Sequence, residues 1–106
     1  MPTVNRLLRI NVGEELLLRC DAEAVPPATF VEIRRRNGLE RVLRTVNGTG
    51  SQTLSVMYRL RNLTLDNSGV YVCVASNSEG ETEVNFTLVV QGRWALFGKA
   101  YETMMQ

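Results

Sequence analysis

Up to about residue 91, apolar and polar residues alternate with a period of two, the pattern of β-strands that bury one face. Two long stretches show this alternation best. Their inward-facing sets are Leu54, Val56, Tyr58 and Leu60, and then Val84, Phe86, Leu88 and Val90. Shorter strands are predicted over residues 7–12, 16–21 and 39–45, and another begins near Thr29, with Val31 and Ile33 on its inward face. No stretch before residue 91 has a convincing helical period, so the pattern predicts an antiparallel β-sandwich.

Turn-forming residues separate these strands at short intervals. Pro26 and Pro27 interrupt strand pairing, because proline has no amide hydrogen to donate. Asn37-Gly38 predicts a tight hairpin, and the segment 80–81 predicts another before the last strand. These turns place consecutive strands side by side in antiparallel order.

The composition fits one domain and excludes several chemistries. With 106 residues, 44% of them apolar and 22% charged, the chain is sufficient for a single core. The net charge of +1 argues against nucleic-acid binding through neutralisation of many phosphates. The absence of histidine excludes histidine-dependent catalysis, and the sequence has neither clustered carboxylates nor metal-ligand spacing. We therefore predict a non-catalytic protein with no metal site and no cofactor.

The chain contains no apolar run long enough to span a bilayer, and it starts with Met1-Pro2-Thr3 instead of a secretory signal. No direct membrane insertion is expected in this segment. If the protein is extracellular, the chain is an excised domain, and its signal peptide and any anchor lie outside the sequence.

Cys20 and Cys73 are the only cysteines. Two cysteines are too few for a disulfide framework, and these two are too far apart for a zinc or redox motif, so the natural interpretation is one pair that spans the core. The alternative is two buried free thiols in a reducing compartment. The strand pattern places Cys20 on the inward face, together with Leu16 and Leu18.

Four groups of residues carry a resemblance to a known family. They are Gly13-Glu14-Glu15 before Cys20, the Leu60-x-x-Leu63 spacing, the run Ser68-Gly69-Val70-Tyr71-Val72-Cys73, and the segment Ala75-Ser76-Asn77-Ser78-Glu79-Gly80. Over residues 7–91 the chain resembles an immunoglobulin domain, in particular the intermediate (I-set) type.

The resemblance implies an all-β, immunoglobulin-like antiparallel β-sandwich with Greek-key topology over residues 1–91, followed by a C-terminal extension over residues 92–106. It also implies that Cys20 and Cys73 bridge the two sheets. Tyr71 would form a tyrosine corner, in which its hydroxyl bonds to the backbone a few residues upstream.

The sequence departs from the family pattern at two positions. Ile33 stands where the family usually has a buried tryptophan, and the only tryptophan follows the last strand. Asn67 stands where the family usually has an aspartate that pairs with an arginine. We therefore expect the tyrosine corner but not the ion pair, with Asp66 as a candidate substitute one position earlier.

One outward face of the expected sandwich combines aliphatic residues with arginines. The alternation turns this set toward solvent: Phe30, Glu32, Arg34 and Arg36 on the third strand, Val70, Val72 and Val74 on the sixth, and Val89 on the last. Such a face is typical of a protein interface, because an isolated sheet face is normally more polar. The alternative is that valine is simply favoured in strands. The partner-binding prediction covers all of these residues except Glu32 and Val70.

Three sequons for N-linked glycosylation occur, at Asn47, Asn62 and Asn85. The alternation turns Asn62 and Asn85 outward, as glycan acceptors must be. Unmodified surface asparagines are the alternative. A glycan on Asn85 would crowd the outward face described above.

Arginines gather around the Asn37-Gly38 hairpin. The set is Arg34, Arg35, Arg36, Arg41 and Arg44. Weak contact with a sulfated glycosaminoglycan is one interpretation of this basic hairpin. The alternative is a solvated strand edge that discourages edge-to-edge aggregation.

Beyond residue 92, apolar residues recur at intervals of three and four. Trp94, Phe97, Tyr101, Met104 and Met105 would share one side of a helix of about three turns. A helix that short needs a surface to be stable, and Trp94, Phe97 and Tyr101 are the predicted contacts. Three alternatives stay open: the tail folds back onto the sandwich, docks on a neighbouring domain or partner, or is an unstructured linker.

The resemblance implies a non-catalytic recognition or adhesion module of a multidomain cell-surface receptor or adhesion protein. Its partner would be another protein, either a receptor, a ligand or a neighbouring immunoglobulin-type domain, and its location extracellular. The alternative is a structural spacer repeat of an intracellular, sarcomeric, titin-like chain, in which the cysteines stay reduced. The sequons favour the first interpretation.

Overall fold

The structure is a computed structural model that describes residues 6–92. Its elements are β1 (Arg6–Asn11), β2 (Leu16–Glu23), β3 (Phe30–Asn37), β4 (Leu39–Asn47), β5 (Thr53–Leu60), the short 3-10 helix η1 (Leu65–Asn67), β6 (Gly69–Asn77) and β7 (Gly80–Gln91). Most strand positions therefore agree with those that the alternation predicts.

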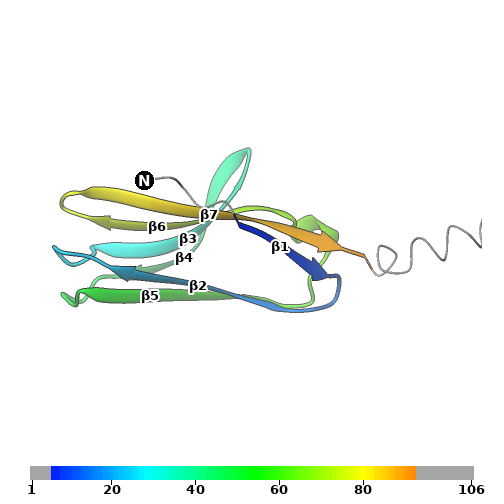
Figure 1. The fold of residues 1–106 in the computed structure, drawn as a ribbon, viewed down its shortest axis with the longest axis horizontal. Helices are drawn as coiled ribbons and strands as arrows, with labels where there is room; N and C mark the ends of the chain where they lie inside the picture. The colour runs from blue at the N-terminus through cyan, green and yellow to red at the C-terminus, as the bar shows by residue number, and fades with distance from the viewer. Residues whose placement is uncertain (1–5, 93–106) are drawn as a thin grey trace, which may run out of the picture.

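Two sheets pack face to face (Figure 1). The larger sheet has five strands in the order β1-β7-β6-β3-β4, and the smaller sheet pairs β2 with β5. Every pair is antiparallel except β1 and β7, which run parallel. The chain passes from one sheet to the other after β1, β2, β4 and β5. The predicted all-β sandwich is confirmed.

The core lies between the two sheets and comes from inward-facing positions. Its fully buried members include Val31 and Ile33 of β3, Val56 of β5, Leu63, and Leu88 of β7. These residues are the ones expected from the two-residue period, because each strand presents alternate side chains to the opposite layer. Ile33 is thus a core residue at the position where the family pattern has tryptophan.

Tyr71 and Phe86 add an aromatic pair to this core. Their rings stack with centroids 5.5 Å apart. They lie opposite each other on β6 and β7, where cross-strand aromatic pairs stabilise a sheet. Tyr71 is fully buried, and Phe86 is half-buried.

Val84 is an exception to the predicted inward set, because 49% of its surface is exposed. The reason lies in the length of β1. The pairing of β1 with β7 starts at Arg6 opposite Phe86, so no described strand covers the edge of β7 before that residue. A side chain that points inward is buried only where the opposite layer or a neighbouring strand closes over it.

The hairpin between β3 and β4 stands away from the sandwich (Figure 1). Gly38 makes its turn with a φ of +95°, which a residue with a side chain rarely adopts. The β3–β4 register shifts between Ile33 and Arg34, and such a bulge bends and twists a strand. β3 stays paired with β6 as far as Arg36 opposite Val70, so the projecting part of the hairpin is the end that carries the turn.

The predicted tail contacts Trp94, Phe97 and Tyr101 lie outside the described residues. Within residues 6–92, no helix is long and apolar enough to cross a membrane.

Candidate functional site

A disulfide holds β6 to the opposite layer. Cys20 of β2 and Cys73 of β6 are bonded, with their Cα atoms 6.0 Å apart. Because β2 belongs to the smaller sheet and β6 to the larger one, the bond joins the two layers, as the resemblance implied. On the chain-entropy model, such a bridge adds about 4 kcal/mol to the free energy of unfolding.

The tyrosine corner anchors the start of β6. The Tyr71 hydroxyl donates to the backbone carbonyl of Asn67 at 2.5 Å, and burial raises the pKa of this phenol. The side-chain oxygen of Asn67 accepts a hydrogen bond from the backbone N–H of Thr64 at 2.8 Å and so caps η1. The amide at position 67 therefore serves the turn that precedes β6.

Arg35 of β3 binds the same turn from the other side. Its Nη2 donates to the carbonyl oxygens of Asp66 and Ser68, the latter at 2.8 Å. The guanidinium carbon lies 5.6 Å from the centre of the Tyr71 ring, within cation–π range. Asp66 thus contributes its backbone carbonyl and not the carboxylate that the sequence suggested as a substitute.

Val72 and Val74 lie on the outer face of the five-stranded sheet, yet both have an exposed fraction of 0%. The prediction that they form an exposed partner-binding patch is wrong. Arg34 opposes Val72 on β3, and Glu32 opposes Val74. Long side chains on neighbouring strands cover short ones at the same level, because their aliphatic stems lie along apolar surface. The direction of the valines was predicted correctly, but their exposure was not.

A network of ion pairs lies on this outer face. Arg34 pairs with Glu32, and also with Glu40 at 3.5 Å. Arg36 pairs with Glu40, and also with Glu83 at 3.3 Å. The Thr45 hydroxyl donates a hydrogen bond to Glu32 at 2.9 Å. Burial is the largest single influence and lowers the pKa of Arg34, but the hydrogen bond with Glu32 and the charges of Glu32, Glu40 and Glu81 together outweigh it, so the pKa is raised. The hydrogen bond from Arg36 lowers the pKa of Glu40. The two arginines of the partner-binding prediction, Arg34 and Arg36, are therefore paired with carboxylates.

Two exposed apolar residues of the larger sheet lie on β4, which the sequence did not single out. Leu39 at the hairpin is 84% exposed, and Val42 is 51% exposed. Val42 lies opposite Arg34, beside the ion-pair network. The sequence does show two large apolar residues just after the hairpin turn, which could have indicated an exposed apolar patch. The face that they occupy could not be predicted, because it depends on the register shift between β3 and β4. Phe30 and Val89, both in the predicted set, are half-buried.

The three sequons differ in exposure. Asn47 and Asn62 are exposed, whereas Asn85 is half-buried on β7 opposite Val72. Asn62 also has a positive φ of 50°, a conformation that asparagine tolerates better than most residues. Glycosylation at these asparagines stays a prediction.

The remaining chemistry of the described part is limited. Arg41 and Arg44 are exposed on β4. Within residues 6–92, no group of three or more Cys, Asp or Glu side chains is placed to hold a metal ion.

Comparison with known proteins places this sandwich among immunoglobulin domains. The sequence profile of the immunoglobulin domain matches residues 2–77. The limbic system-associated membrane protein of Gallus gallus is 37% identical over 86 residues, which cover 76% of this chain and 23% of that protein. Hemicentin-1 of Mus musculus is 33% identical over 83 residues, which cover 76% of this chain and 1% of that protein. The chain thus spans less than a quarter of the length of these relatives.

A solved structure shows the same fold. The second Ig domain of the mouse polymeric immunoglobulin receptor superposes with a TM-score of 0.64 and 12% sequence identity, covering 82% of this chain and 96% of that one. At this identity the likeness concerns the fold alone.

Proposed function

The chain belongs to the immunoglobulin domain family, and from this premise we propose that it is a non-catalytic recognition module of a cell-surface protein whose partner is another protein. The relatives named above support this function over a sarcomeric spacer, because one of them is by name a membrane protein. The I-set subtype stays a prediction.

The observation that carries the proposal is that Val42 lies beside the ion-pair network on the outer face. Val42 is half exposed, and Arg34 beside it is held by Glu32 and Glu40. Protein interfaces commonly surround an apolar anchor with charged groups whose positions are fixed before binding, since a fixed group loses little entropy on association. We assign the partner contact to Val42, Arg34 and Arg36, with Phe30 and Val89 at its margins.

The experiment displays the chain as a multimer and measures its capture by an array of recombinant cell-surface ectodomains that includes the chain itself. We expect at least one ectodomain to bind, and Val42→Arg to weaken that binding by about tenfold or more. Met57→Arg is the matched control, because Met57 is 49% exposed on a strand of the other sheet. Both variants should melt at the wild-type temperature within a few degrees.

Two results would overturn the proposal. One is an array in which no ectodomain, including the chain itself, captures the multimer. The other is binding that Met57→Arg abolishes and Val42→Arg leaves unchanged, which would move the contact to the β2–β5 sheet.

An extracellular location is part of the same proposal. The interlayer disulfide and the exposed sequons at Asn47 and Asn62 support it. Titration of thiols in unfolded, unreduced protein from its native compartment should find none, and two would contradict this location. We do not extend the proposal to Asn85, because a glycan there would obstruct the outer face.

Glycosaminoglycan contact is the weaker part of the partner assignment. Arg34 and Arg36 already bind carboxylates, so only Arg41 and Arg44 of the basic hairpin are left to attract sulfate groups. Retention on heparin that Arg41→Gln does not reduce would refute this contact.

A further inference from the structure

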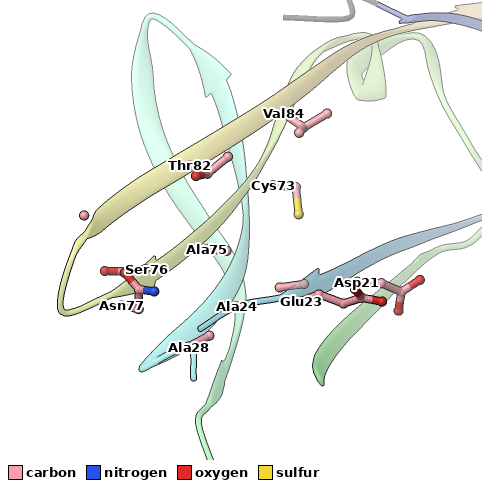
Figure 2. Close-up of a pocket in the computed structure, with 12 residues that line it drawn as sticks. Asp21, Glu23, Ala24, Ala28, Cys73, Ala75, Ser76, Asn77, Thr82 and Val84 are labelled. Carbon is pink, nitrogen blue, oxygen red and sulfur yellow. The ribbon is translucent and has the colours of Figure 1, made fainter. Parts of the chain in front are cut away.

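A cleft of about 240 Å³ opens between the two layers, where β2 faces the first half of β7. Figure 2 shows its walls, with Asp21 and Glu23 on one side and Thr82 and Val84 on the other. Within residues 6–92, β1 pairs with β7 only from Phe86 onward, so no described strand pairs with the part of β7 that lines the cleft on that edge. Alanines line much of the remaining wall and fill little of the space.

Cys73 forms part of the cleft wall. It is only half-buried, whereas Cys20, the other half of the disulfide, is buried. In Figure 2 the Cys73 sulfur points from β6 into the space between the layers. Ala75, two residues further along the same strand, also lines the cleft and is too small to close over it. Of the two cysteines of the bridge, only Cys73 therefore borders the cleft.

The mouth of the cleft is acidic. Hydrogen bonds from Ser55 and Arg19 lower the pKa of Asp21, so this carboxylate is charged at neutral pH. Arg19 offsets part of that charge, but Glu23 is exposed and forms no ion pair with another described residue. The field at the mouth attracts cations and repels anions.

We propose that Cys73 is the site of thiol–disulfide exchange in the folded domain, and that the cleft favours thiols with a positive charge over thiols with a negative one. Exchange rates depend on access to a sulfur and on which sulfur is attacked, and of the two cysteines only Cys73 lines the cleft. This inference is independent of the partner contact, because the cleft lies on the inner side of the larger sheet.

The chemistry balances as two displacements. A thiolate attacks the Cys73 sulfur, a mixed disulfide forms, and the bond to Cys20 breaks with its electron pair on the Cys20 sulfur, which takes a proton from water. A second thiolate attacks the mixed disulfide, forms the small-molecule disulfide and releases the Cys73 thiolate, which is also protonated. Two thiols are oxidised to one disulfide, and the protein bridge is reduced to two thiols.

The first test separates attack on the folded domain from attack after unfolding. The reduction rate of the full 106-residue chain is followed in excess 2-mercaptoethanol at increasing urea, well below the unfolding midpoint. Attack through the cleft predicts a rate that is nearly independent of urea in this range. A rate that rises with the full slope of global unfolding would overturn the proposal.

The second test measures charge selectivity with three thiols: cationic cysteamine, neutral 2-mercaptoethanol and anionic 2-mercaptoethanesulfonate. Each rate is divided by the rate at which the same thiol reduces the bridge of the urea-unfolded chain, which corrects for the intrinsic reactivity of the thiol. A unit charge about 8 Å from a reacting charge changes a rate about twofold in water, so one unpaired carboxylate at the mouth of the cleft should make the cationic thiol exceed the anionic one about fourfold to fivefold. Added salt should reduce this ratio.

Glu23→Gln should bring the cationic-to-anionic ratio close to that of the unfolded chain. Glu81→Gln is the matched control, because it removes the same charge from an exposed residue that does not line the cleft. Both substitutions are on the surface and should leave folding intact. Equal corrected rates for the three thiols in the wild type, or equal effects of the two variants, would contradict the assigned site.

Discussion

Replacing Val72 with alanine tests the buried position of the outer-face valines directly. The substitution removes two methyl groups from a side chain with no exposed surface. At about 0.8 kcal/mol for each methyl group, plus a term for the cavity left under the ion-pair network, the free energy of unfolding should fall by about 2 kcal/mol. For a domain of this size, the melting temperature should decrease by roughly 8 to 16 °C.

Val42→Ala provides the matched control, because it makes the same chemical change on the same sheet face. Half of the Val42 surface is already in water, so its cost should stay below about 1 kcal/mol. Urea denaturation of both oxidised variants, with an unchanged m-value, would give the two free energies on one scale. A loss for Val72→Ala no larger than that for Val42→Ala would refute the covered position of Val72 and restore the exposed patch expected from sequence.

Two further predictions concern other parts of the fold. Gly48→Ala should lower the free energy of unfolding by about 1 to 3 kcal/mol, because a β-carbon at that position would clash with the backbone carbonyl oxygen of Ala28. Thermal unfolding measures the loss, and an unchanged melting temperature would contradict the close approach. Glu40→Gln should destabilise the domain at pH 7, and the difference from wild type should vanish as the pH falls. The sign follows because the folded-state pKa of Glu40 lies below its usual 4.5, so its contribution is complete above that value and is lost on protonation below it. Melting curves from pH 7 to pH 3 check this, and a difference that persists at pH 3 would contradict it.

The sequence was sufficient for the features that depend on local spacing. The two-residue period identified Val31, Ile33 and Val56 as core residues, because strand geometry sends alternate side chains to opposite faces whatever the neighbours are. Cys73 and Tyr71, two residues apart, share the inward face for the same reason. The layer that each strand joins came from the family resemblance and not from the period.

The sequence was insufficient wherever exposure depends on a neighbouring strand. Val72 and Val42 are both valines that point outward, yet one is covered and the other is half exposed. Val72 lies in the middle of the sheet, with Arg34 on one side and Asn85 on the other. Val42 lies on the edge strand β4, so a neighbouring strand can cover it from only one side. Strand order is a property of the whole fold, and no pattern within either segment reports it.

The same argument explains why the cleft beside Cys73 was not foreseen. Its opening depends on where β1 starts to pair with β7, and this register is set by contacts between segments far apart in the sequence. Val72 and Cys73 are adjacent on β6, and the alternation sends one beneath the ion-pair network and the other to the cleft. Reduction of the bridge removes the covalent link between β6 and β2, while β6 keeps its hydrogen-bonded partners β3 and β7. Partner binding on the outer face and thiol exchange at the cleft therefore act on opposite sides of the same strand. Because one strand serves both, binding measurements require a fixed redox state of the Cys20–Cys73 pair.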